Sequence, residues 1–280
     1  MRSTTIILAF ISTACAFIPH ANILTNTRKI RMSTVEDVPD TAMYKRFGHL
    51  KGKDVKTVSE TIKSFCIQYQ KPILPQYRTM INDVLQSTHL NVVNGCFIYD
   101  AMFGYGFYSL FYKLMKAYPG TGEADLIYAA MVTSLDMEPE KLKEDHETIS
   151  KLIENMTRAD LENSFKGENQ NLLSEISSNI KADEFYLYTK TWGIGLIEAM
   201  DKVGIPLTEE NIESLANMIG FSPIKARQDL VQYKDVLDKV AQAEQLFKEI
   251  EIREKKKMAE RLEEKAKRAL EAAKKAEESQ

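Results

Sequence analysis

Apolar residues recur at intervals of three and four along most of this chain, and that spacing is typical of amphipathic helices. The first predicted helix covers 57–69. Thr57 and Glu60 stand there at the capping-box spacing, in which each side chain accepts from the other residue's backbone N–H. A second helix begins at Pro75, because proline suits the first turn, and ends near residue 94.

Two further predicted helices, 101–118 and 185–203, are rich in aromatic residues and apolar on most sides. A helix without a polar face belongs at the centre of a core. Each also carries two glycines, Gly104 with Gly106 and Gly193 with Gly195. A helical glycine costs about 1 kcal/mol relative to alanine, so we expect another backbone to pass very close to these positions. The two helices are predicted to make one tight crossing, in which Gly104 and Gly193 take part.

The remaining amphipathic stretches predict several shorter helices and one long helix. The shorter ones cover 123–135, 138–156, 168–181 and 208–219. The long helix begins after Ser222 at Pro223, and no helix-breaking residue follows, so it is predicted to run to about residue 276. No segment has the alternation of a β-strand. The chain is therefore predicted to be all-α.

The long helix changes character near residue 251. Before this point, apolar residues such as Tyr233, Leu237 and Val240 follow a heptad-like spacing, which is typical of a coiled coil. Beyond it, large apolar residues become rare among many Ala, Lys and Glu. We therefore predict a single helical domain over 57–250 and a long charged C-terminal helix extension over 251–280, which protrudes from the domain.

The N-terminal region contains two targeting signals and a leader. Residues 1–16 have the basic start, short apolar run and Ala-Cys-Ala ending of a secretory signal peptide. Residues 17–33 are basic and contain no acid, which is typical of a transit peptide. Residues 34–56 lack a helical period and are predicted to form a flexible leader. The pair of signals resembles the presequence of proteins sent to a plastid wrapped in extra membranes; the alternative is a secreted protein with a loose tail.

The composition, 44% hydrophobic and 28% charged, fits a soluble globular protein. Removing 1–33 changes the 37 basic and 40 acidic residues to 33 and 40, a net charge of −7 that argues against nucleic acid as a partner. The uncharged stretch over 101–112 is shorter than the roughly 20 residues of a membrane span, so no transmembrane segment is predicted in the mature chain. Its two cysteines, Cys66 and Cys96, are interpreted as buried thiols.

No pattern for catalysis, cofactor binding or metal binding stands out. The mature histidines, His49, His89 and His146, lack the preceding Glu that di-iron carboxylate bundles require. The two glycine pairs lack the third glycine and the strand of a nucleotide loop, and no Gly-x-Ser-x-Gly elbow occurs. We therefore predict a protein that is not an enzyme, with no cofactor and with no catalytic, cofactor-binding or metal residues.

Two features of the C-terminal third could bind a partner. The helices around Gly220 could form a DNA-binding helix-turn-helix, although an ordinary helical hairpin fits the acidic chain better. Basic residues in the extension could contact anionic lipid or an acidic partner; the alternative is that they only solvate an exposed helix. The candidate interaction residues are Arg253, Lys255, Lys256 and Lys257.

Several segments, taken in order, resemble one known family. They are Thr57 to Thr61 with Lys63, Ser64 and Phe65; Lys71 to Ile73 and Tyr77; Tyr99, Asp100, Phe103, Gly106 and Phe107; Tyr118 and Pro119; Trp192 to Leu196; and Asp229, Leu230, Tyr233, Lys234, Gln242, Ala243 and 253–257. Together they are similar to the Thylakoid Formation family, also called the photosystem II biogenesis protein family, over about 57–261. Trp192 departs from the family's expected Phe, and the leader has no counterpart.

The resemblance implies a helical plastid or cyanobacterial protein without known catalysis, needed for thylakoid organisation and for assembly or repair of photosystem II. It also implies partnership with the thylakoid FtsH protease, and it supplies no agreed site residues. We expect an interaction protein of the plastid stroma and thylakoid, which can also contact photosystem II components and the membrane surface. The alternative is a helical carrier of a pigment or lipid, which a sizeable cavity lined by Phe103, Phe107 and Trp192 would favour.

Overall fold

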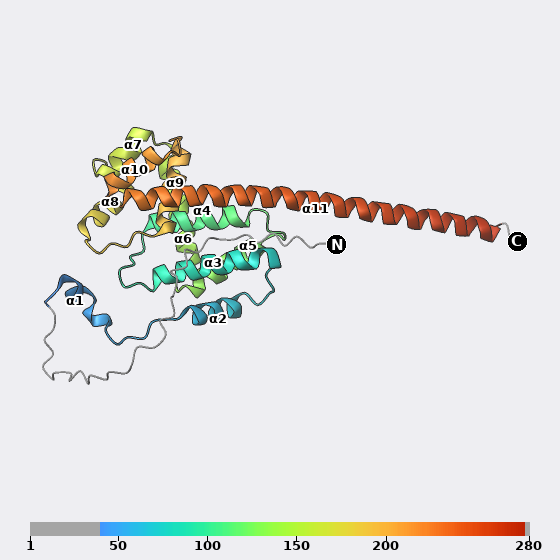
Figure 1. The fold of residues 1–280 in the computed structure, drawn as a ribbon, viewed down its shortest axis with the longest axis horizontal. Helices are drawn as coiled ribbons and strands as arrows, with labels where there is room; N and C mark the ends of the chain where they lie inside the picture. The colour runs from blue at the N-terminus through green and yellow to red at the C-terminus, as the bar shows by residue number, and fades with distance from the viewer. Residues whose placement is uncertain (1–39, 278–280) are drawn as a thin grey trace, which may run out of the picture. The chain divides into compact units, whose positions relative to one another are not determined.

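The sequence is rich in helical periodicity and capping residues, and the regular structure of its described part is entirely helical. The computed structural model describes residues 40–277, and within these residues it has eleven α-helices, one short 3-10 helix and no strand (Figure 1). The predicted all-α fold is confirmed. The predicted signal peptide (1–16) and transit peptide (17–33) lie outside the described residues.

The helices divide between two compact units. Unit 1 contains α1 (Ala42–Phe47), η1 (Gly48–Leu50), α2 (Val58–Gln68), α3 (Pro75–Val92) and most of α5 (Glu123–Ser134), together with 185–187. Unit 2 contains α4 (Ala101–Met115), nearly all of α6 (Pro139–Glu154), α7 (Arg158–Lys166), α8 (Leu172–Ala182), α9 (Lys190–Val203), α10 (Glu209–Ile219) and α11 (Pro223–Glu277).

In unit 1, the pairing of α2 with α3 is fixed by a cap and a buried hydrogen bond. Thr57 Oγ1 accepts from the Glu60 backbone N–H at 3.3 Å, and Glu60 Oε2 accepts from the Thr57 N–H at 2.7 Å, so the predicted capping box is confirmed. One turn later, the buried Thr61 hydroxyl lies 2.9 Å from Nδ1 of the buried His89 on α3. This bond satisfies two polar groups that would otherwise be costly to bury.

The leader predicted over 34–56 contains α1 and η1 within its described part, from residue 40 onward. Thr41 caps α1 by accepting from the Tyr44 N–H at 3.1 Å. At the other end, the Phe47 ring packs edge-on against Phe185, with ring centroids 5.6 Å apart. Arg46 also lies over the Phe185 ring, 5.8 Å from its centroid. Phe185 therefore belongs to unit 1.

This placement corrects the start of the second aromatic helix. Helix α9 begins at Lys190, where Thr189 Oγ1 accepts from the Trp192 N–H at 3.2 Å, and the predicted start at residue 185 was wrong. The aromatic residues of 185–188 have helical spacing, but a threonine cap and unit 1 contacts take precedence over that spacing. The predicted end at Val203 is confirmed, because Gly204 adopts the left-handed conformation, with φ +78°, that ends a helix.

The segment between α6 and α9 holds a helix that was not predicted. Helix α7 follows a capping box in which Thr157 Oγ1 accepts from the Asp160 N–H at 3.3 Å and Asp160 Oδ2 accepts from the Thr157 N–H at 2.9 Å. Gly167 ends α7 in the left-handed conformation, so α8 begins after the Asn171 cap and not at residue 168. Apolar side chains of α7, α8 and α10 are buried where these helices pack together: Leu161, Phe165, Leu173, Ile212 and Leu215.

Unit 2 is built around the crossing of α4 and α9. A Cβ atom added to Gly106 would lie 2.1 Å from the Thr191 carbonyl oxygen and 2.7 Å from the Gly195 nitrogen. One added to Gly195 would lie 2.7 Å from the Met102 carbonyl oxygen. Real Cβ atoms do not approach other atoms below 3.0 Å, so only glycine permits this crossing. The predicted tight crossing is confirmed, and Gly106 and Gly195 form it.

Gly193 has a different role from the one predicted. The atom nearest to a Cβ added there is the Tyr188 hydroxyl oxygen at 2.1 Å, and the Asp229 carboxylate follows at 3.3 Å. Tyr188 donates to Asp229 Oδ2 at 2.7 Å. Gly193 therefore leaves space for this pair of side chains. The neighbouring Trp192 is buried and donates from Nε1 to Asp100 Oδ2, the N-cap residue of α4, at 3.1 Å.

Candidate interaction site

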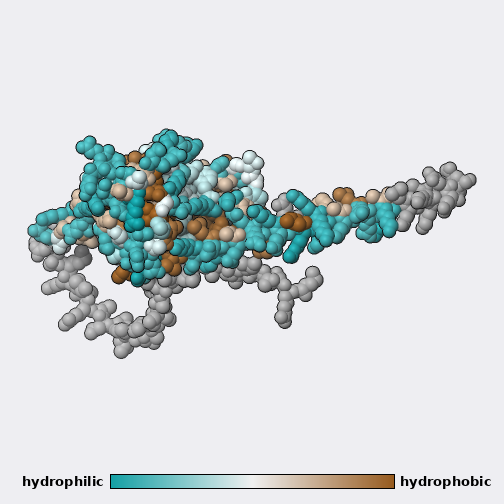
Figure 2. All heavy atoms as spheres, turned by 90° about the horizontal axis from the view of Figure 1, so that it is seen from above, coloured by the Kyte–Doolittle hydropathy of each residue, from teal (hydrophilic) through white to brown (hydrophobic). Residues whose placement is uncertain are grey.

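Helix α11 is a single helix of 55 residues, about 80 Å long at 1.5 Å per residue. It starts at the predicted Pro223, and its first part packs on α4, α9 and α10, where Leu230 and Tyr233 are buried. Its last part extends beyond those helices (Figure 1), and every side chain over 252–269 is exposed. Figure 2 shows that this part is mainly hydrophilic, with a few apolar patches.

The packed part of α11 is anchored by a buried carboxylate on α9. Glu198 is only 6% exposed, and its Oε1 accepts both from Lys113 Nζ of α4 at 2.7 Å and from the Tyr233 hydroxyl of α11. Burial, reinforced by the Glu198 charge, raises the pKa of Tyr233, so the phenol stays protonated and keeps donating. This one carboxylate therefore connects α4, α9 and α11 through hydrogen bonds.

The first turns of α11 make a second set of polar contacts. Asp229 accepts the Tyr188 hydroxyl, and burial raises the pKa of this carboxyl group. Lys190 Nζ donates to Gln232 Oε1 at 2.8 Å, and Lys234 Nζ donates to the Leu207 carbonyl at 2.6 Å. The start of α11 is thereby fixed against α9 and the loop before α10.

These anchoring residues were not predicted from the sequence. Their partners are far apart in the chain, with Lys113 and Tyr233 lying 85 and 35 residues from Glu198. The sequence does contain a signal for a buried, partnered carboxylate. Glu198 is the single charged residue among the apolar positions from Trp192 to Met200 of α9. A charge on such a helix must find a partner when it is buried.

The four predicted interaction residues, Arg253, Lys255, Lys256 and Lys257, all lie on the exposed part of α11. Because successive helical residues are rotated by about 100°, Arg253, Lys256 and Lys257 fall within an arc of about 100° on one face of the helix, and Lys255 points to another side. Arg253 forms an ion pair with Glu249 one turn earlier, at 3.8 Å. Over 252–269 there are eight basic and four acidic residues, a net charge of +4, whereas the whole chain carries −3. The exposed part of α11 is thus a basic extension of an acidic protein.

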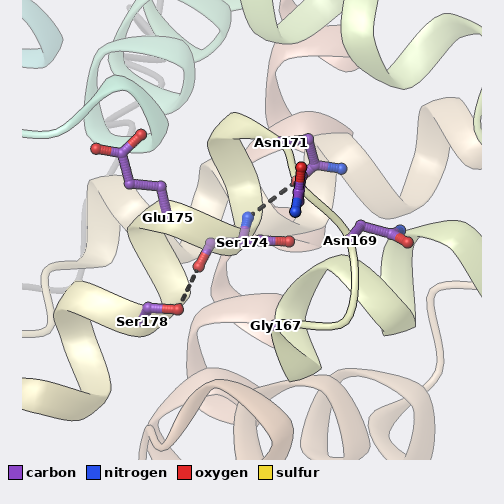
Figure 3. Close-up of a pocket in the computed structure, with 7 residues that line it drawn as sticks. Gly167, Asn169, Asn171, Ser174, Glu175 and Ser178 are labelled. Atoms are coloured by element: carbon purple, nitrogen blue, oxygen red, sulfur yellow. Dashed lines mark hydrogen bonds between the residues drawn. The ribbon is translucent and has the colours of Figure 1, made fainter.

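A polar hollow of about 400 Å³ lies where α7 passes into α8 (Figure 3). Asn171 Oδ1 accepts from the Ser174 N–H at 3.0 Å, and Ser178 Oγ donates to the Ser174 carbonyl at 2.7 Å. The Ser174 hydroxyl itself is buried without a hydrogen-bond partner. The other lining residues are Gly167, Asn169, Gln170 and Glu175. Hydroxyl, carboxamide and carboxylate groups of this kind can hold a small polar molecule.

The three aromatic residues that the carrier alternative places around a cavity are buried against other side chains. Phe103, Phe107 and Trp192 are each 1% exposed. The Phe103 and Phe107 rings stack with centroids 6.5 Å apart, and the Trp192 ring packs edge-on against Phe221 at 4.8 Å. The hollow beside α8 is lined by other residues.

The two thiols and His146 differ in their surroundings. Cys66 is exposed and Cys96 is half-buried, so the prediction that Cys66 is buried was wrong. His146 of α6 stacks on Tyr105 and Tyr108 of α4, with centroids 5.3 and 4.4 Å apart, and burial lowers the pKa of His146 to about 4. Among the described residues, no group of three or more His, Cys, Asp or Glu is placed to hold a metal ion.

None of the helices over 40–277 combines the length and the hydrophobicity that a membrane span requires.

Comparison with known proteins decides the family. The model of the thylakoid formation protein family matches residues 57–262. This chain belongs to the thylakoid formation protein family. The protein THYLAKOID FORMATION1, chloroplastic, of Oryza sativa subsp. japonica is 30% identical over 210 residues, which cover 74% of this chain and 72% of the rice protein. Protein Thf1 of Synechococcus sp. strain JA-3-3Ab is 28% identical over 207 residues, covering 70% and 86%.

The fold of this thylakoid formation protein also matches a solved structure. The structure of Psb29 aligns with a TM-score of 0.65 at 28% identity, covering 73% of this chain and 99% of that one. Family membership confirms the resemblance found in the sequence and implies a role in thylakoid biogenesis that is related to photosystem II. The plant relatives are named chloroplastic, which supports a plastid and thylakoid-associated location. The family is named for thylakoid formation and not for a reaction.

Proposed function

We propose that this thylakoid formation protein is a non-catalytic interaction protein of the plastid stroma that supports assembly or repair of photosystem II. Its proposed main partner is the thylakoid FtsH protease, and photosystem II components and the thylakoid membrane surface are further contacts. The observation that carries the proposal is the exposed basic extension of α11, which unit 2 anchors through Glu198 at its other end.

Charge gives this extension a way to bind. A basic residue near an anionic membrane surface contributes on the order of 1 kcal/mol, so several residues must act together to give a useful affinity. Arg253, Lys256 and Lys257 lie within little more than one helical turn and on the same side of the helix, which allows them to do so. Salt screens such contacts over a Debye length of about 8 Å at physiological ionic strength. Binding by the extension should therefore weaken steeply as salt rises.

The pigment or lipid carrier remains the second candidate function, and the core geometry favours it less. A carrier needs an apolar cavity that encloses most of its ligand. Phe103 and Phe107 stack on each other, Trp192 packs against Phe221, and the Gly106–Gly195 contact brings the α4 and α9 backbones together. A filled crossing of this kind supports an interaction protein.

The test removes the extension from the otherwise intact protein. Truncation after Ile250 should leave the melting temperature of the remaining protein nearly unchanged, because the deleted side chains over 252–269 are all exposed. The truncated protein should recover less FtsH protease than the parent from solubilised thylakoids, and less protein should bind to vesicles that contain anionic lipid. Both losses should shrink at high salt.

A charge variant separates the role of the four residues from that of the whole extension. Changing Arg253, Lys255, Lys256 and Lys257 together to Gln should reproduce most of the loss. Changing the exposed Lys143 and Lys151 of α6 to Gln is the matched control and should change binding little. A truncated protein that unfolds, or one that recovers the protease at full strength, would refute the proposed role of the extension.

A further inference from the structure

The exposed part of α11 carries a seam of regularly spaced residues that unit 2 does not cover. Ile252, Ala259 and Ala266 are seven residues apart, and three residues after them come Lys255, Leu262 and Ala269. This alternation of three and four is the a and d pattern of a coiled coil. Ile252 and Leu262 are 65% and 62% exposed, so the two large apolar side chains of the seam remain accessible to a partner.

We propose that this seam pairs with the same seam of a second copy of the chain, with the two helices running antiparallel. The proposal concerns contact between two copies and does not depend on the protease contact proposed above. It rests on how the side chains match in size and charge along the seam.

Size matching favours the antiparallel direction. When Ala259 faces Leu262 of the second copy, Ile252 faces Ala269 and Lys255 faces Ala266. Each layer then combines one long side chain with one alanine, so the helices pack at one uniform distance. Parallel pairing would instead place Ile on Ile, Leu on Leu and Ala on Ala. Those layers differ in width along the seam, and the helices could not stay in contact at all of them.

Lys255 decides the direction by its charge. In a parallel pair the two Lys255 side chains would meet in the seam, and like charges that meet there are unfavourable. In the antiparallel pair each Lys255 lies over the small Ala266 of the second copy. Its aliphatic stem can then cover the seam while the ammonium group reaches water.

Charges beside the seam fit the same arrangement. Lys256 follows one d position and Glu263 follows the next, and both are exposed. In the antiparallel register Lys256 of one copy lies beside Glu263 of the other, and symmetry makes this contact twice. Arg253 and Lys257 lie on the outer face, so the pair still presents basic residues to other partners.

Cysteine cross-linking tests both the pairing and its direction. The background is residues 34–280 with Cys66→Ser and Cys96→Ser, and the two variants are Ile252→Cys and Ala269→Cys. An antiparallel pair brings residue 252 close to residue 269 of the second copy, within the distance that a disulfide can span. Mild oxidation of a mixture should therefore give the disulfide between 252 and 269, identified by peptide mass spectrometry, and neither variant should cross-link when oxidised alone. Lys257→Cys, on the outer face, is the control and should give no cross-link on oxidation.

Charge exchange gives an independent readout by sedimentation over a concentration series. Lys256→Glu or Glu263→Lys alone should weaken self-association about tenfold, because two exposed pairs are lost and replaced by repulsion. The double exchange should restore it, and Lys257→Glu should leave it unchanged. A protein that stays monomeric without any cross-link would overturn the proposal. Cross-links of 252 to 252 would also overturn it, since they show a parallel pair.

Discussion

The contact between Gly106 and Gly195 predicts a graded response to one added methyl group. In Gly106→Ala the new Cβ would lie 2.1 Å from the Thr191 carbonyl oxygen, and in Gly195→Ala the new Cβ would lie 2.7 Å from the Met102 carbonyl oxygen. Ordinary contact begins near 3.4 Å, so the overlaps are about 1.3 and 0.7 Å. Both obstacles are backbone atoms, and no rotamer change can relieve them.

The overlap translates into a sizeable loss of stability. To relieve it, α4 and α9 must separate by about the overlap distance, and a gap of 0.5–1 Å already costs packed atoms roughly a quarter to a half of their dispersion energy. Overpacking of this kind costs about 1–3 kcal/mol, or more when backbone must move. Alanine recovers about 1 kcal/mol through its higher helix propensity. We expect a net loss of about 2 kcal/mol or more for Gly106→Ala and about 1 kcal/mol for Gly195→Ala, measured by denaturant unfolding.

Gly193 supplies the control because its obstacle is a side chain. Gly193→Ala places its Cβ against the Tyr188 hydroxyl, so the substitution should be costly in the parent and clearly cheaper in a Tyr188→Phe background. The same background should give no relief to Gly106→Ala. If Gly106→Ala unfolds at the same denaturant concentration as the parent, the backbone contact does not limit the crossing and the reasoning is wrong.

Three further predictions concern polar groups. Between about pH 7.5 and 5.5, His146→Gln should lose on the order of 1 kcal/mol less stability than the parent, as measured by unfolding curves at both pH values. The reason is that folded His146, with a pKa of about 4, resists the proton that the unfolded residue binds below about pH 6.5. Glu198→Ala should lower the free energy of unfolding, measured in denaturant, by about 2–3 kcal/mol, because alanine leaves the buried Tyr233 hydroxyl without an acceptor. Glu198→Gln should lower it less, and equal losses for the two variants would argue against the anchor. Thr57→Ala should cost about 1 kcal/mol in thermal melts, whereas the exposed Ser59→Ala should change little; equal melting temperatures would show that the cap is unimportant.

Several helix ends were predicted from local signals. The Thr57 capping box, Pro75 in the first turn, Gly220 after α10 and Pro223 at the start of α11 all act through neighbours within four residues. The pair of Thr157 and Asp160 gives the same kind of signal before α7, although that helix was not predicted. The family was also predictable, because its motifs lie in order along the chain.

Contacts between distant residues were not predictable from spacing. Periodicity predicted that two glycine-bearing helices cross, but which glycines touch depends on how each helix is rotated about its axis. Gly193 faces Tyr188 and Asp229 because α11 packs on that side of α9, and no local pattern reports this packing. The role of Glu198 was not predicted for the same reason, because its hydrogen bonds join three separate helices.

Anchored at one end and exposed at the other, α11 has the mechanics of a lever. Its held part reaches at least to Glu244, which pairs with Lys116 at 3.4 Å, and 33 residues separate Glu244 from Glu277 at the described end of the helix, a distance of about 50 Å. A rotation of about 10° at Glu244 would move that end by roughly 9 Å, which exceeds the Debye length of about 8 Å. A small repacking of the held part could therefore bring the basic residues of the exposed part into or out of electrostatic reach of a surface. A load on the arm would conversely act on the contacts of the held part, among them the hydrogen bonds of Glu198 and the ion pair of Glu244.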